Sequence, residues 1–202
     1  MRRAPAVLLL VFVLAGCGGG SNGETQPSGQ VDLGPAFDDI ATLPGAQNHP
    51  PPWGAGSDQL QLRLRRIGLP ALQAEGQVLH IHQHLDLFVD GRKVTVPANV
   101  GIDPSGAFIS DLHTHDTTGI IHVESPTEQQ FTLGQFFAVW AVPLSATQIG
   151  SLKGERVRTW VDGKPVNADP TGIILAAHQE IVLAYGAAPK TVPSKYDFPE
   201  GL

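Results

Sequence analysis

Apolar and polar residues alternate along residues 78–96, a pattern that predicts a β-hairpin. Asp90-Gly91 is a strong two-residue turn signal, and a loop at these two residues places Leu87 opposite Val94. One face of the hairpin is then wholly apolar and is expected to face the core: Leu85, Leu87, Val89, Val94 and Val96. The opposite face carries four polar residues: His80, His82, His84 and Asp86.

A second hairpin is predicted over residues 111–124, with its loop at residues 116–119. This loop places His113 opposite His122 and Asp111 opposite Glu124. Directly opposed residues have Cβ atoms about 4.5–5.5 Å apart, so two such imidazoles can share one metal ion. His115 lies on the same face. A slip of one residue would break this alignment, so the register is a specific prediction.

Helical periodicity occurs in two places. Residues 132–140 predict a helix with Thr132 as its N-cap and with large apolar side chains on one face. Residues 57–67 favour a short helix that begins at Ser57, although leucines at alternate positions leave a strand open as the alternative.

The rest of the pattern predicts a hairpin over residues 157–166 and a last apolar strand over residues 180–185. These elements indicate an α+β fold, with a mostly antiparallel sheet and one main helix. Without the hairpin at residues 111–124, the element order resembles a β-grasp (ubiquitin-like) fold, so we expect that hairpin to be an insertion. A small β-barrel or sandwich is the alternative.

The first 16 residues have the features of an export signal, with Arg2 and Arg3 before a short apolar stretch. Leu14-Ala15-Gly16-Cys17 resembles the bacterial lipobox, which implies that Cys17 is lipidated. Residues 17–56 are rich in Gly and Pro and predict a flexible tether. Residues 57–202 are then a single histidine-rich globular domain. We expect a protein of the cell envelope, anchored to a membrane by lipid, with its domain outside the cytoplasm.

Composition narrows the chemistry. Cys17 is the only cysteine and Met1 the only methionine, which excludes an intramolecular disulfide, a thiolate site and a Cu(I) thioether site. The formal net charge is −6, and removal of Arg2 and Arg3 with the signal would make the chain more acidic. An acidic domain is a poor partner for nucleic acid, so no nucleic-acid partner is expected.

Seven of the eight histidines lie between His80 and His178. Imidazole is the commonest protein ligand for zinc, copper and nickel, and a sulfur-free set points to Cu(II) or Zn(II). The expected metal ligands are His80, His82, His84, His113, His115 and His122. Residues that could add a ligand or hold one by a hydrogen bond are Asp86, Asp111, Asp116, Glu124 and His178.

The favoured function is a membrane-tethered metal-binding protein that captures Cu(II) or Zn(II), or transfers it to another extracytoplasmic metal-handling protein. One alternative is a zinc- or copper-dependent enzyme with a three-histidine site and an open coordination position, with Glu124 or Asp116 as general base. No nucleophile motif supports catalysis. The other alternative is an interaction module without metal. Residues 80–102, 112–125 and 131–137 also resemble a recurrent block in uncharacterised exported bacterial lipoproteins, a family with no named activity.

Overall fold

The computed structural model describes residues 31–34 and 36–202, which belong to one compact unit, Val31–Leu202. The predicted export signal, Cys17 and the first part of the tether lie outside the described residues. Among the described residues, no helix is long and apolar enough to cross a membrane. The elements, in chain order, are η1 (Ile40–Thr42), α1 (Leu60–Ile67), β1 (Leu79–Val89), β2 (Arg92–Val94), β3 (Leu112–His113), β4 (Ile120–Ser125), α2 (Leu133–Trp140), β5 (Leu144–Ser145), β6 (Gln148–Ile149), β7 (Leu152–Lys153), β8 (Arg158–Val161), β9 (Lys164–Val166), η2 (Pro170–Gly172) and β10 (Glu180–Tyr185).

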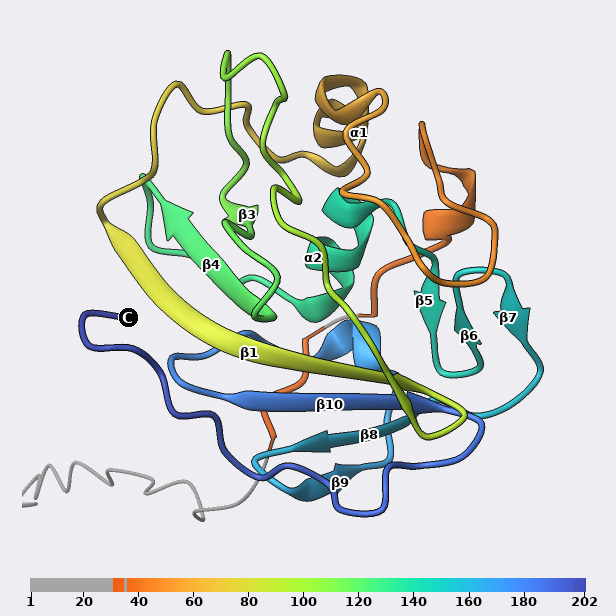
Figure 1. The fold of residues 1–202 in the computed structure, drawn as a ribbon. Coiled ribbons are helices and arrows are strands. Elements are labelled where there is room, and N and C mark those ends of the chain that lie inside the picture. The colour runs from red at the N-terminus through yellow and green to blue at the C-terminus, as the bar shows by residue number, and fades with distance from the viewer. Residues whose placement is uncertain (1–30, 35) are drawn as a thin grey trace, which may run out of the picture. The chain divides into compact units, whose positions relative to one another are not determined.

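The main sheet is built around the long strand β1 (Figure 1). Its strands lie in the order β3-β4-β1-β10-β8-β9, and β2 also pairs with β1. The first half of β1 pairs with β4, and its second half pairs with β10 and β2. Only β1 and β10 run parallel among these pairs, so the sheet is mixed but mostly antiparallel.

These features confirm the α+β class, with a second short sheet formed by β5, β6 and β7. The described strands do not close into a barrel, because the order of the main sheet ends at β3 and at β9. Assignment to the β-grasp family remains a prediction. The described residues contain two α-helices of eight residues each: α2 lies at the predicted main helix, and α1 lies within the predicted short helix.

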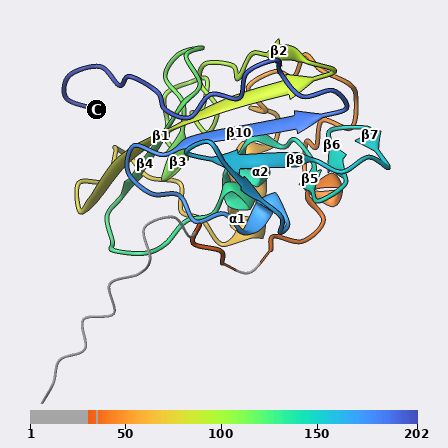
Figure 2. The same ribbon diagram turned by 90° about the horizontal axis from the view of Figure 1, so that it is seen from below.

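Helices α1 and α2 lie on one side of the sheet, and the C-terminal segment crosses the other side (Figure 2). Leu85 and Leu87 of β1 are fully buried on the helix side, in one cluster with Phe136 and Phe137 of α2. The predicted apolar face of the first hairpin is therefore the core face. Its histidine face is the outer face of the sheet, because side chains alternate along β1.

The two Asp-Gly turns have the conformation that their sequence predicts. Asp90 and Gly91 have φ angles of 49° and 74°, and Asp162 and Gly163 have φ angles of 51° and 74°. Positive φ at both central residues suits a tight two-residue hairpin. Leu87 pairs with Val94, so the predicted register of the first hairpin is confirmed.

The N-terminal ends of the two helices differ. Thr132 caps α2 in a capping box with Gln135, as the sequence predicts. Residues 60–67 form a helix and not a strand, but Ser57 is not its N-cap. Gln59 occupies that position with φ 55° and makes no side-chain cap, because the chain turns sharply just before the helix.

The sequence predicts that the globular domain begins at residue 57, but the compact unit begins earlier and includes the described part of the predicted tether. Ile40 and Trp53 are buried in the core cluster of the domain. Arg63 of α1 is also fully buried, and its guanidinium donates to the carbonyl oxygens of Pro44, Gly56, Asp58 and Val139. These bonds fix the segment before α1 to the end of α2. The Gly- and Pro-rich composition conceals these few anchoring residues, and Val31 begins the compact unit.

Candidate metal centre

The strand register aligns histidines across three neighbouring strands. His113 of β3 pairs with His122 of β4, and His122 pairs with His82 of β1. In the next row, Glu124 of β4 pairs with His80 of β1. The predicted register of the inserted hairpin is confirmed. That hairpin extends the sheet beside the first half of β1 and brings both histidine runs to one face.

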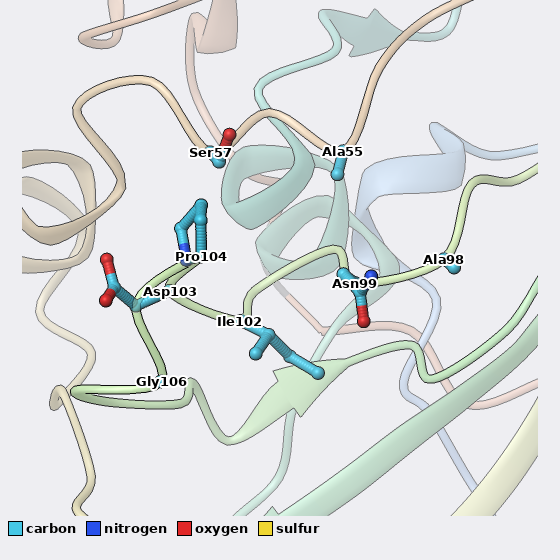
Figure 3. Close-up of a pocket in the computed structure, with 8 residues that line it drawn as sticks. All are labelled: Ala55, Ser57, Ala98, Asn99, Ile102, Asp103, Pro104 and Gly106. Carbon is cyan, nitrogen blue, oxygen red and sulfur yellow. The ribbon is translucent and has the colours of Figure 1, made fainter.

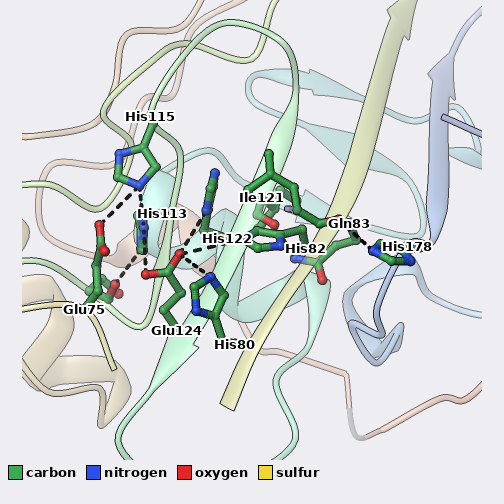
Figure 4. Close-up of polar contacts among 12 residues, drawn as sticks. Glu75, His80, His82, Gln83, His113, His115, Ile121, His122, Glu124 and His178 are labelled. Atoms are coloured by element: carbon green, nitrogen blue, oxygen red, sulfur yellow. Dashed lines mark hydrogen bonds and ion pairs between the residues drawn. The ribbon is translucent and has the colours of Figure 1, made fainter. Parts of the chain in front are cut away.

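Glu124 lies among the histidine side chains of both rows (Figure 4). Its Oε1 lies 3.0 Å from His122 Nδ1, 3.4 Å from His80 Nε2 and 3.8 Å from His82 Nε2. Its Oε2 lies 3.9 Å from His113 Nε2. The carboxylate therefore meets nitrogen atoms from three strands.

His113 is oriented by the backbone. Its Nδ1 lies 3.0 Å from the carbonyl oxygen of Ser110, which can only accept a hydrogen bond. In the neutral ring the proton is thus on Nδ1, and Nε2 keeps its lone pair. This Nε2 lies 3.2 Å from His115 Nε2. Two nitrogens bound to one tetrahedral zinc ion at about 2.0–2.1 Å lie about 3.3 Å apart, so the pair fits one ion.

The protonation states of the side chains in the cluster also favour the binding of a cation. Burial is the main cause that lowers the pKa of His113 and of His82 to about 4, so both rings are neutral at pH 7. Burial alone would raise the pKa of Glu124, but the hydrogen bond with His122 and the charges of His113 and His80 lower it to about 2. Glu124 is therefore a carboxylate among imidazoles with available lone pairs.

Glu75 joins the cluster without any signal in the sequence. Its Oε1 lies 3.3 Å from His115 Nε2, and both side chains are 43% exposed. The neighbouring Gly76 lets the backbone pass close to Ser125, because a Cβ atom at residue 76 would lie 2.1 Å from the carbonyl carbon of Ser125. Glu75 precedes β1 and belongs to no alternating pattern, so spacing alone could not select it.

His84 is separated from the other histidines. Its Nδ1 lies 2.7 Å from Glu180 Oε2, and its Nε2 lies 2.9 Å from the carbonyl oxygen of Thr118. Tyr196 stacks on the ring, with centroids 3.9 Å apart and planes 10° apart. Both nitrogens have protein partners, so His84 ties the loop of the inserted hairpin to β10. His84, Asp86 and Glu180 also form a third group that could hold a metal ion, apart from the main cluster.

Asp86 and Asp111 are also apart from the main cluster. Asp86 can form a group with His84 and Glu180, but its Oδ1 lies 2.5 Å from Lys93 Nζ, a cation already in place. Asp111 lies opposite Glu124, as predicted, because the amide of Glu124 donates to its carbonyl oxygen. The Asp111 side chain is fully buried, burial raises its pKa, and its carboxyl belongs to no ligand group among the described residues.

His178 and Asp116 have structural contacts. The amide of His178 donates to the carbonyl oxygen of His82, and its Nε2 lies 3.0 Å from Leu202 O. Asp116 Oδ1 accepts hydrogen bonds from the amide and hydroxyl of Thr118, and these bonds are the main cause that lowers its pKa. Asp116 therefore shapes the exposed loop and does not reach the cluster as a general base.

A surface pocket of about 500 Å³ lies elsewhere, between residues 55–57 and 98–106 (Figure 3). Its single ionisable lining residue is Asp103. The carboxylate of Asp103 accepts hydrogen bonds from Ser105 and Ala107 in its own turn. The pocket offers no group with chemistry beyond that turn.

Two groups of side chains in the cluster could each hold a metal ion. One is His113, His115, His122 and Glu124, and the other is His80, His82 and Glu124; within each group the ligand atoms lie within 4.8 Å of one another. Models of known protein families, curated proteins and solved structures give no match to this chain. Fold and site thus define an α+β protein with a histidine–glutamate cluster that could bind a metal ion.

Proposed function

We propose that this protein is a metal-binding lipoprotein of the cell envelope, held at a membrane through Cys17, that captures Cu(II) or Zn(II) or passes it to another metal-handling protein. One observation carries the proposal. His113, His115, His122 and Glu124 place four ligand atoms within 4.8 Å of one another. Three imidazole nitrogens and one carboxylate oxygen match the composition of known zinc and copper sites.

The choice of metal follows from ligand chemistry. The set contains nitrogen and oxygen donors, which suit Cu(II) and Zn(II) better than Cu(I). Affinity for such a set is higher for Cu(II) than for Zn(II). Capture and release need access, and His115 provides it, because its side chain is 43% exposed while His113 is fully buried. An ion would therefore enter and leave on the His115 side.

A metalloenzyme is the second candidate function, and it is favoured by the exposure of two histidine side chains in the cluster. His80 and His115 are 44% and 43% exposed, so solvent reaches the cluster at two places. A bound metal with an open position would supply activation of water. In that case Glu124, as a carboxylate, could accept a proton at Oε2. Metal-dependent hydrolysis of a panel of activated esters and phosphates would favour this candidate over simple binding.

The test is metal content by mass spectrometry on the full chain, purified in detergent without an affinity tag, followed by titration with Cu(II) and Zn(II). We expect saturable binding, and His113→Ala should remove the ion held by the group that contains His113. The control is His49→Ala, since His49 is exposed, its ring Nδ1 lies 2.8 Å from the carbonyl oxygen of Pro50, and it belongs to no ligand group among the described residues. No saturable binding would refute both metal functions and leave the interaction module.

The membrane anchor needs its own test. Metabolic labelling with a radioactive fatty acid should mark the wild-type chain and not Cys17→Ser. The variant should also leave the membrane fraction on cell fractionation. Labelling of both chains, or of neither, would contradict the proposed anchor without affecting the metal site.

A further inference from the structure

Glu124 faces two separate sets of histidines with its two oxygen atoms. Its Oε1 lies 3.4 Å from His80 Nε2 and 3.8 Å from His82 Nε2. The same oxygen lies 3.0 Å from Nδ1 of His122, whose ring keeps Nε2 as a second nitrogen. Its Oε2 lies 3.9 Å from His113 Nε2, on the side where His115 also lies. A carboxylate placed between two ligand sets can give one oxygen to each.

Two buried atoms in this arrangement lack a partner. His82 Nε2 and Glu124 Oε2 have no hydrogen-bond partner among the described residues, and the side chains of both residues are at least nine-tenths buried. A buried polar atom without a partner is costly, so in a native structure such an atom commonly has an ion, a water molecule or a functional role to account for it. These two atoms point to different groups: His82 Nε2 belongs with His80, and Glu124 Oε2 faces His113.

The distances fit ligands of common ions better than hydrogen bonds. Two atoms that bind one ion at about 2.0–2.1 Å lie about 3.3 Å apart in tetrahedral geometry, and between about 2.9 and 4.1 Å apart for angles from about 90° to about 180°. The separations of 3.4 and 3.8 Å within the His80 group lie in that range. The 3.9 Å separation between His113 and Glu124 does so as well. Hydrogen bonds between imidazole nitrogens and carboxylate oxygens are usually no longer than about 3.2 Å.

One ion cannot use all of these ligands. The cluster offers six residues, whereas zinc takes four ligands in a structural site. The six residues also fall into two groups that share only Glu124. We therefore propose that the cluster binds two divalent ions, Cu(II) or Zn(II), bridged by the carboxylate of Glu124. This inference rests on the proposed metal-binding function.

The two positions are unequal. The first has three histidines, and the second has His80 and His82. The second position offers fewer protein ligands, and it opens to solvent where His80 is 44% exposed. It should therefore bind its ion more weakly and exchange it faster than the first position. A bridged pair with one exchangeable ion is suited to passing metal onward.

The experiment titrates the full chain in detergent with Cu(II) alone and follows it by calorimetry and electron paramagnetic resonance. Two unpaired spins a few ångströms apart couple magnetically, so the second equivalent should change the spectrum and produce a half-field signal. His115→Ala and His80→Ala are matched variants, because their side chains are 43% and 44% exposed and neither should unfold the protein. His80→Ala should bind about one equivalent without the half-field signal, whereas His115→Ala should weaken binding at the first position, where His113, His122 and Glu124 remain.

The outcomes separate the two proposals. Two equivalents with magnetic coupling, with the coupling lost in His80→Ala and kept in His49→Ala, support the bridged pair. One equivalent in the wild type overturns the pair but leaves the proposed metal binding intact. Two equivalents without coupling overturn the bridge at Glu124. No binding at all overturns both proposals. Glu124→Gln should abolish the magnetic coupling, whereas the first position should still bind an ion through its three histidines.

Discussion

Metal-free protein should lose stability as the pH falls, because two buried histidines resist protonation. Burial is the main cause that lowers the pKa of His82 and His113 from 6.5 to about 4 in the folded protein. In the unfolded chain both imidazoles return to a pKa near 6.5. Between these values the unfolded chain binds more protons than the folded protein, so the free energy of unfolding falls as the pH falls from about 6.5 to about 4.

The magnitude follows from the two pKa values. For one such histidine, the loss relative to pH 7.5 is about 1.3 kcal/mol at pH 5.5 and about 2.5 kcal/mol at pH 4.5. If His82 and His113 act independently, the loss at pH 4.5 is about 5 kcal/mol. The total stability of a domain is about 5–15 kcal/mol, so the metal-free protein should be near its unfolding limit at that pH.

The assay is urea unfolding in the presence of a chelator, at several pH values between 7.5 and 4.5, for the wild type and for His113→Gln. Asp111 and Glu180 act in the opposite direction, since burial raises the pKa of both carboxyls. Both are present in both proteins, so the difference between the two curves isolates His113. The variant should lose about half of the histidine-dependent pH effect. Identical curves would refute the reasoning, because His113 would then titrate alike in the folded and unfolded states.

Arg63→Met should lower the free energy of unfolding in urea by at least about 3 kcal/mol, because four carbonyl oxygens, that of Val139 in a buried contact, lose their donor. A loss below about 1 kcal/mol would contradict this role. Gly119→Ala should cost about 1–3 kcal/mol in thermal unfolding, since Gly119 has φ 96° and a Cβ would lie 3.0 Å from His84 Nε2. His84→Gln should weaken the fold yet leave the copper stoichiometry unchanged, and a lost equivalent would place His84 in the metal site.

Alternation along the strands was sufficient to predict one face of the site. Side chains repeat with a period of two along a strand, so the opposed pair His113 and His122 followed from the position of one loop. The core face with Leu85 and Leu87 followed from the Asp90-Gly91 turn in the same way. Local turn chemistry thus fixes which residues face each other within a hairpin.

Local patterns do not determine which hairpins become neighbours. The pairing of β4 with the first half of β1 brings His122 beside His82, and it depends on contacts between segments about 40 residues apart. The same limitation conceals Arg63, whose acceptors come from segments on both sides of α1 in the sequence. A charged residue in a short amphipathic helix indicates a solvated face, and only the folded chain shows that it is buried.

Glu124 shows why the division between ligands and structural residues needs the fold. In the sequence, Glu124 and Glu180 each follow a histidine by two residues, His122 and His178. In the fold, Glu124 lies opposite His80 and next to the row that contains His82 and His122, whereas Glu180 lies opposite His84 on the parallel strand β10. The antiparallel neighbour of β1 thus gives its carboxylate several imidazoles. The parallel neighbour gives its carboxylate one imidazole, whose other nitrogen is already bound to Thr118. The lateral order of strands, and not the histidine spacing, decides which of the histidines share one carboxylate.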